Sequence, residues 1–135
     1  MIKHLPLLGH RMTRIFPILL FIGLAWGQEY SLNDIVEMDN GLFTEKFSDE
    51  PISGKVYNYF GKSNYSGKKV YIGNLLNGQK EGKWVWYWEN GKKKQDYNYK
   101  NGNLHGKVSN WYEDGQKDRE VHFKNGVLEG SVIFW

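Results

Sequence analysis

The chain has 135 residues, no cysteine and a formal net charge of +3. This length allows one domain with its own core, and the lack of cysteine excludes disulfides, cysteine-ligated metals and the lipid-attached cysteine of bacterial lipoproteins. Three bases near the N-terminus account for the net charge, so nucleic-acid binding is not expected.

Residues 1–27 have the pattern of a secretory signal peptide. The first part carries three bases: Lys3, Arg11 and Arg14. The apolar stretch 15–26 is shorter than the ~20 residues of a bilayer-spanning helix, and Ala25 and Gly27 place small residues before a cleavage site. We therefore expect export to a periplasm or the exterior. An uncleaved anchor is the alternative, and Met12 is an alternative start.

Residues 28–53 form an acidic leader that does not repeat. They contain one base and seven acids, whereas residues 54–135 contain 14 bases and eight acids. The two parts can partly neutralise one another. Apolar residues on both sides of Asn40-Gly41 predict a capping hairpin between Ile35 and Phe47, because the terminal units of repeat arrays are commonly atypical.

From residue 54 onward the sequence repeats with a period of 24 residues. The repeated turn pairs are Asn77-Gly78, Asn101-Gly102 and Asn125-Gly126 in one column, and Asn90-Gly91 and Asp114-Gly115 in the other. Aromatic and β-branched runs between them favour strands. The pattern predicts an all-β protein, an elongated single-layer antiparallel meander of β-hairpins. Residues 54–135 hold about three and a half units, with four extra residues between Tyr59 and Ser66.

The register can be counted outward from the turns if each pair forms a two-residue type I′ turn. This count places Trp84 opposite Tyr97, Trp88 opposite Lys93, and Gln95 opposite Val108. One face then becomes the expected core face. Its members are Trp84, Trp86, Trp88, Tyr97, Tyr99, Leu104, Val108, Tyr112, Val121, Phe123, Leu128, Val132 and Phe134.

The opposite face carries an aromatic column that recurs at the period, formed by Tyr87, Trp111 and Trp135. Val85 and Ile133 flank it, so an exposed apolar patch is expected there. Such patches often mark surfaces that bind partners. The alternative is that the leader or the curvature of the sheet covers this face.

Lysines also recur in columns. They are Lys69, Lys93 and Lys117 in one column, and Lys83 and Lys107 in the other. Stacked units would make basic ladders that can contact anionic lipid or an acidic partner. The alternative is that Lys93 and Lys117 lie over Trp88 and Tyr112 and keep the sheet soluble.

No pattern of residues points to catalysis. His105 and His122 have no carboxylate at a spacing that suggests a proton relay, and the glycines recur as turn residues. No metal signature, nucleotide-binding loop or nucleophile motif is present. We expect no enzymatic activity, cofactor or metal.

The run Gly82-Lys83-Trp84-Val85-Trp86-Tyr87-Trp88-Glu89-Asn90-Gly91, followed by Tyr99-Lys100-Asn101-Gly102, resembles the bacterial variant of the MORN repeat (membrane occupation and recognition nexus). The resemblance covers roughly residues 41–135. Proteins of this kind are often labelled YwqK-like antitoxins, so it implies an elongated sheet that binds another protein, antitoxin-like or immunity-like. The resemblance implies no catalytic residues.

We therefore expect an exported module for protein–protein interaction. The alternative is a peripheral envelope protein held on anionic lipid by the basic ladders. The final strand, near Trp135, is expected to leave an open edge through which the protein can add a partner strand or oligomerise.

Overall fold

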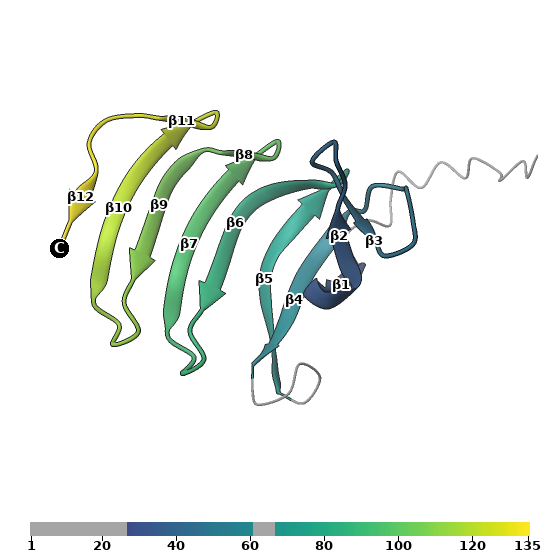
Figure 1. Cartoon of the computed structure of the whole chain (residues 1–135), viewed down its shortest axis with the longest axis horizontal. Coiled ribbons are helices and arrows are strands. Elements are labelled where there is room, and N and C mark those ends of the chain that lie inside the picture. The colour runs from purple at the N-terminus through teal and green to yellow at the C-terminus, as the bar shows by residue number, and fades with distance from the viewer. Residues whose placement is uncertain (1–26, 61–66) are drawn as a thin grey trace, which may run out of the picture.

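The computed structural model describes residues 27–60 and 67–135, which form a long single-layer β-sheet with a small hairpin at one end (Figure 1). The expected signal peptide lies outside the described residues except for Gly27, and so does most of the segment expected to hold the four extra residues. No helix in the described ranges is long and apolar enough to cross a membrane.

The elements follow in chain order: β1 (Glu29–Ser31), the 3-10 helix η1 (Leu32–Asp34), β2 (Ile35–Glu37), β3 (Phe43–Glu45), β4 (Gly54–Phe60), β5 (Lys68–Leu76), β6 (Gln79–Tyr87), β7 (Lys93–Lys100), β8 (Asn103–Leu104), β9 (Gly106–Trp111), β10 (Lys117–Lys124), β11 (Val127–Leu128) and β12 (Ile133–Phe134). The large sheet has the order β1-β4-β5-β6-β7-β9-β10-β11, with β8 beside β7 and β12 beside β10. The expected all-β meander is confirmed. It has one parallel pair, β1 with β4, which the repeat does not predict.

Two kinds of turn alternate along the sheet, although both contain an Asn-Gly or Asp-Gly pair. In the turns at Asn77, Asn101 and Asn125, the asparagine and the following glycine both have positive φ, as a type I′ turn requires. In the turn at Asn90-Gly91 only the glycine has positive φ, and the Asn90 side chain accepts a hydrogen bond from the Lys92 N–H at 2.9 Å. The Asp114-Gly115 turn repeats this contact.

The second kind of turn has a three-residue loop, which corrects the expected register. The Gly91 N–H donates to the Trp88 carbonyl and the Trp88 N–H donates to the Lys92 carbonyl. Trp84 pairs with Tyr97 as expected, but Lys93 pairs with Tyr87 and not with Trp88. A bulge therefore follows the turn and moves Lys93 to the other face of the sheet.

A second departure lies between β8 and β9. Tyr99 pairs with Leu104 as expected, whereas Gln95 pairs with Asn110 and not with Val108. The chain breaks the ladder at Gly106, where φ is 91°. Because the shift is two residues, each side chain keeps its expected face.

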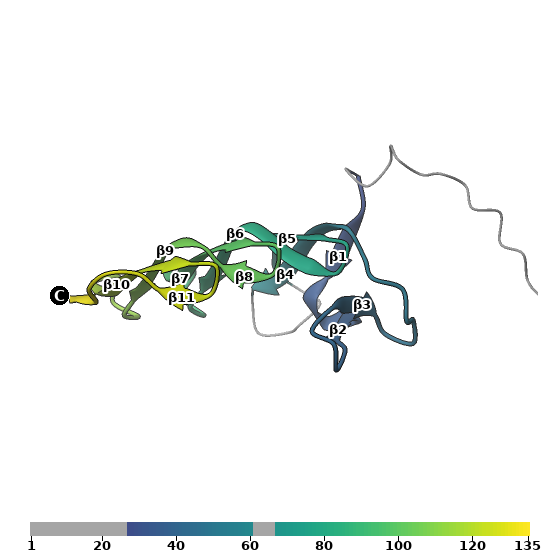
Figure 2. The ribbon, with the colours of Figure 1, turned by 90° about the horizontal axis from the view of Figure 1, so that it is seen from above.

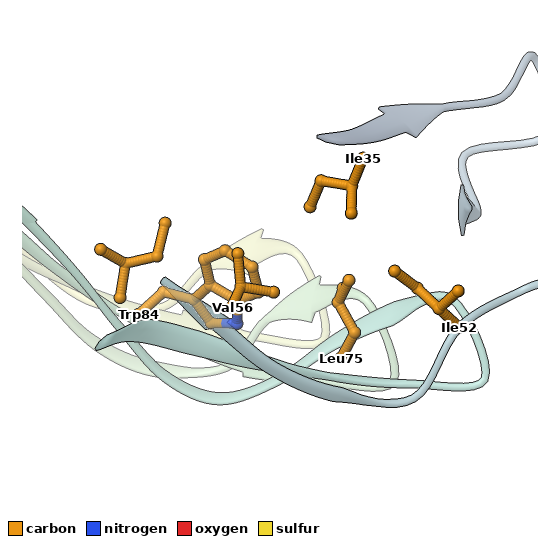
Figure 3. Packing of buried hydrophobic residues seen from close by; sticks show 6 residues of the cluster. Ile35, Ile52, Val56, Leu75 and Trp84 are labelled. Carbon is orange, nitrogen blue, oxygen red and sulfur yellow. The ribbon is translucent and has the colours of Figure 1, made fainter. Parts of the chain in front are cut away.

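The core lies at the N-terminal end of the sheet and not along its whole length. The hairpin of β2 and β3, called here the leader hairpin, lies over one face of the sheet at this end (Figure 2). Figure 3 shows Ile35 reaching from this hairpin toward the sheet. The buried cluster consists of Ile35, Ile52, Val56, Ile72, Leu75 and Trp84.

Burial falls with distance from the leader hairpin. The equivalent positions Val56, Trp84, Val108 and Val132 are 0%, 1%, 7% and 38% exposed. The expected core face is therefore only partly a core. Four of its members are exposed: Tyr112, Leu128, Val132 and Phe134. The short hairpin covers only the first strands, so the other end of this face has nothing in the described chain packed over it.

Trp84 connects the core to the repeat array. Its indole Nε1 donates to the Asn74 carbonyl at 3.1 Å, and its ring lies directly against Gly73. One period later the equivalent pair is Tyr97 with Val108. A large residue therefore faces a small one in both units, and Gly73 provides the space that the indole requires.

Backbone bonds and one lysine attach the leader to the array. The Phe43 N–H donates to the Gly78 carbonyl at 2.8 Å, and the Gly78 N–H donates to the Ile52 carbonyl at 2.7 Å. The Lys80 Nζ lies 5.2 Å from the Phe43 ring and 5.3 Å from the Trp84 ring. Burial among these rings lowers the pKa of Lys80, while the rings offer the ammonium a cation–π contact.

Thr44 in the leader hairpin is fully buried, and its Oγ1 has no hydrogen-bond partner among the described residues. Such an atom has lost its hydrogen bonds to water on folding and has gained none in the protein, so it bears the full free-energy cost of desolvation. Thr44→Val removes the hydroxyl at nearly constant volume, so we expect it to raise the free energy of unfolding by about 1 kcal/mol in urea titrations. Thr44→Ser is the control: it keeps the hydroxyl, removes a buried methyl and should destabilise. A Thr44→Val variant less stable than wild type would contradict this account.

Candidate interaction surface

The face opposite the leader hairpin carries the residues expected to bind a partner, and we call it the outer face. It consists of Val85, Tyr87, Trp111, Ile133 and Trp135, together with the charged side chains beside them. Alternation along β6 places Val85 and Tyr87 opposite the buried Trp84. The leader hairpin packs on the other face, so it does not cover the aromatic column.

Exposure on the outer face increases toward the C-terminal end. Val85, Tyr87 and Trp111 are half-buried, whereas Ile133 and Trp135 are exposed by 51% and 60%. The Tyr87 ring makes an edge contact with Phe60, with centroids 5.5 Å apart. The aromatic column is thus part of a continuous surface and is not closed into a pocket.

The ladder lysines are paired with acids on this face. Asp96 Oδ2 contacts the Nζ atoms of Lys83 and Lys93 at 2.9 and 3.1 Å. One period later, Glu120 contacts Lys107 at 3.4 Å and also contacts Lys117. The hydrogen bond from Lys117 and the nearby Lys107 charge lower the pKa of Glu120. Each unit therefore contains two lysines and one carboxylate, a local excess of one positive charge.

Lys69 belongs to the same column but has a different partner. It pairs with Glu29, from β1, and its Nζ lies 4.0 Å from the Tyr57 ring centroid. The hydrogen bond from Lys69, together with one from Tyr71, lowers the pKa of Glu29. The acidic leader thus neutralises the first lysine of the column directly.

The structure corrects which aromatic rings the lysine ammonium groups contact. The Lys93 Nζ lies over Trp111, 4.9 Å from the ring centroid, and not over Trp88. The Lys117 Nζ lies over Trp135 at 4.4 Å and not over Tyr112. The residue over Trp88 is Lys94, at 4.3 Å. The physical reason is the bulge after each three-residue turn, which moves these lysines to the outer face.

Aromatic and cationic side chains therefore alternate across successive strands. We call this set the aromatic–lysine row; it consists of Tyr87, Lys93, Trp111, Lys117 and Trp135. Tyr87 pairs with Lys93, and Trp111 pairs with Lys117. A shallow hollow of about 280 Å³ lies in the row and is lined by Lys92, Lys93, Trp111 and Gly115.

Sequence reasoning placed the aromatic column but put Lys93 and Lys117 on the opposite face, and it did not identify Asp96 as a partner of the lysines. Asp96 and Glu120 stand 24 residues apart, so the period itself contained the signal. Ser109, which is buried, donates a hydrogen bond to Glu120 at 3.3 Å. These residues hold the lysines in place above the rings.

The described structure has further features outside the row. A mostly apolar hollow of about 430 Å³ lies near the Asn77-Gly78 turn, and its lining includes Leu75, Leu76, Lys55 and Glu81. The described residues contain no group of three His, Asp or Glu side chains that could hold a metal ion. The aromatic–lysine row is the more extended feature because it crosses strands from β6 to the end of β12.

Comparison with known proteins identifies the repeat. The family model described as MORN repeat variant matches residues 80–101 and 104–125. No curated protein and no solved structure matches this chain.

Proposed function

Because its central repeats are MORN repeats of the variant type, we propose that this chain is a non-catalytic, exported module that binds another protein through its outer face. The observation that carries the proposal is the aromatic–lysine row, in which Trp111 and Trp135 lie on a face that the leader leaves open. Tryptophan and tyrosine are enriched at the centres of protein interfaces and among the residues that contribute most of the binding energy.

The row favours a protein partner over a lipid surface. All five ladder lysines contact a carboxylate, so much of the charge that would attract anionic lipid is already compensated. The remaining excess of one positive charge per unit is smaller than the clusters of roughly four to eight bases that bind anionic lipid. The envelope-lipid role is therefore the second candidate, and an antitoxin-like or immunity-like role is one form of the first.

The test of the proposed function uses two adjacent aromatics on opposite faces. Trp111→Ala should weaken capture of the crosslinked partner from envelope fractions by roughly thirtyfold, which corresponds to about 2 kcal/mol for a central tryptophan. Tyr112→Ala is the matched control, because Tyr112 is 51% exposed and lies on the other face. Circular dichroism should show that both variants remain folded.

Two results would count against the proposal. Equal capture by wild type and Trp111→Ala would remove the outer face from the interface. Salt-sensitive flotation with anionic but not neutral vesicles, together with no protein partner, would instead support the lipid role.

A further inference from the structure

The spacing of the aromatic–lysine row restricts the shape of what can bind along it. Tyr87, Trp111 and Trp135 recur on every second strand, through the pairings of β6 with β7, β7 with β9, β9 with β10 and β10 with β12. Neighbouring strands are ~4.8 Å apart, so the backbone positions that carry the aromatic rings repeat every ~9.6 Å. The sheet is a single layer, seen edge-on in Figure 2, and the row crosses its strands on one face.

A polyproline II helix has nearly this repeat. It has three residues per turn and rises ~3.1 Å per residue, which gives ~9.3 Å per turn. Over the two steps from Tyr87 to Trp135 the mismatch is only ~0.6 Å. Two turns of an α-helix span ~10.8 Å, so the mismatch would be ~2.4 Å. A β-strand presents side chains to one face every ~6.7 Å and does not match.

We propose that the aromatic–lysine row binds an acidic, proline-rich segment in the polyproline II conformation, which crosses the strands at right angles. This inference rests on the proposed function and names the class of partner for the same face. Each turn of the ligand places a proline against Tyr87, Trp111 or Trp135. Aromatic surfaces that recognise proline-rich segments use the same contact.

The charges of the outer face match an acidic ligand. Each unit has two lysines for one carboxylate, as in Lys83 and Lys93 with Asp96, so one acidic residue per ligand turn neutralises it. The Lys93 ammonium leaves the Trp111 ring for the ligand carboxylate, and a proline ring takes its place. Polyproline II carbonyls have no internal hydrogen bonds and can also accept from these lysines.

The probe is a fluorescein-labelled peptide of about four Pro-Pro-Glu repeats, ~37 Å long at ~3.1 Å per residue. Fluorescence anisotropy with the folded protein should give a dissociation constant below ~1 mM. A Gly-Ser-Glu peptide of equal length and charge should bind at least about tenfold more weakly, because it is not preorganised. A Pro-Pro-Lys peptide should not bind, because its charge is reversed.

Variants assign the binding to the row. Trp111→Ala and Lys93→Gln should each weaken Pro-Pro-Glu binding about tenfold or more, whereas Tyr112→Ala should leave it unchanged. Equal affinity for the Pro-Pro-Glu and Gly-Ser-Glu peptides, or full binding by Trp111→Ala, would overturn the inference.

The peptide assay and the capture assay together distinguish failure of this inference from failure of the proposed function. Suppose that the Pro-Pro-Glu peptide does not bind, while the wild type captures a partner that Trp111→Ala does not capture. This result would overturn the polyproline II assignment and leave the proposed function standing. A captured partner retained by Trp111→Ala would overturn the proposed function, and the inference with it.

Discussion

Gly73→Ala is expected to lower the free energy of unfolding by about 3 kcal/mol, at the upper end for overpacking a core. A Cβ at this position would lie 2.2 Å from Cδ2 and 2.3 Å from Cε2 of the Trp84 indole. The ring cannot retreat easily, because Trp84 is 1% exposed and its Nε1 is bonded to Asn74. Urea titration followed by circular dichroism measures the loss.

Two further variants separate this clash from other effects of adding a methyl group. Gly82→Ala meets no atom within 4 Å but has a φ of 68°, so it should cost only about 1 kcal/mol through backbone strain. In a Trp84→Val background, which imitates the Tyr97 and Val108 unit, Gly73→Ala should cost less than about 1 kcal/mol. An equal cost in both backgrounds would show that the indole is not the obstacle.

Trp84→Ala is expected to cost about 3–5 kcal/mol, because it removes the largest side chain of the buried cluster. The loss should release the leader hairpin as well, since Trp84 packs in the same cluster as Ile35 and Ile52. Hydrogen exchange should then be faster at Thr44 and its neighbours. Urea titration gives the overall loss of stability.

The matched control is the equivalent position at the other end of the array. Val132→Ala should cost about 1 kcal/mol or less, because Val132 is 38% exposed and has no leader packed over it. Comparable losses at the two positions would contradict the conclusion that the leader hairpin confines the core to the first strands.

The turns show where prediction from sequence succeeded and where it failed. Asn101-Gly102 forms the expected type I′ turn, and Tyr99 pairs with Leu104 as counted from it. Asn90-Gly91 is the same dipeptide in a different turn, because the Asn90 side chain accepts a hydrogen bond from Lys92 and the loop gains a residue. A dipeptide does not distinguish these turns, and a single extra residue reverses the faces near it.

The candidate surface was predicted in part. The period placed Tyr87, Trp111 and Trp135 in one column without knowledge of the fold. It did not place Lys93 and Lys117 beside them, because that depends on the bulge after each turn.

The sequence by itself determined the repeat, the hairpins and the aromatic column, because these depend on local turn residues and on an even period that keeps each column on one face. Only the tertiary structure decided which part of the expected core face is buried. The leader hairpin covers it near Trp84 and leaves it open near Val132. Burial depends on what packs over a strand, and alternation along the strand shows which side chains share a face without showing what covers them.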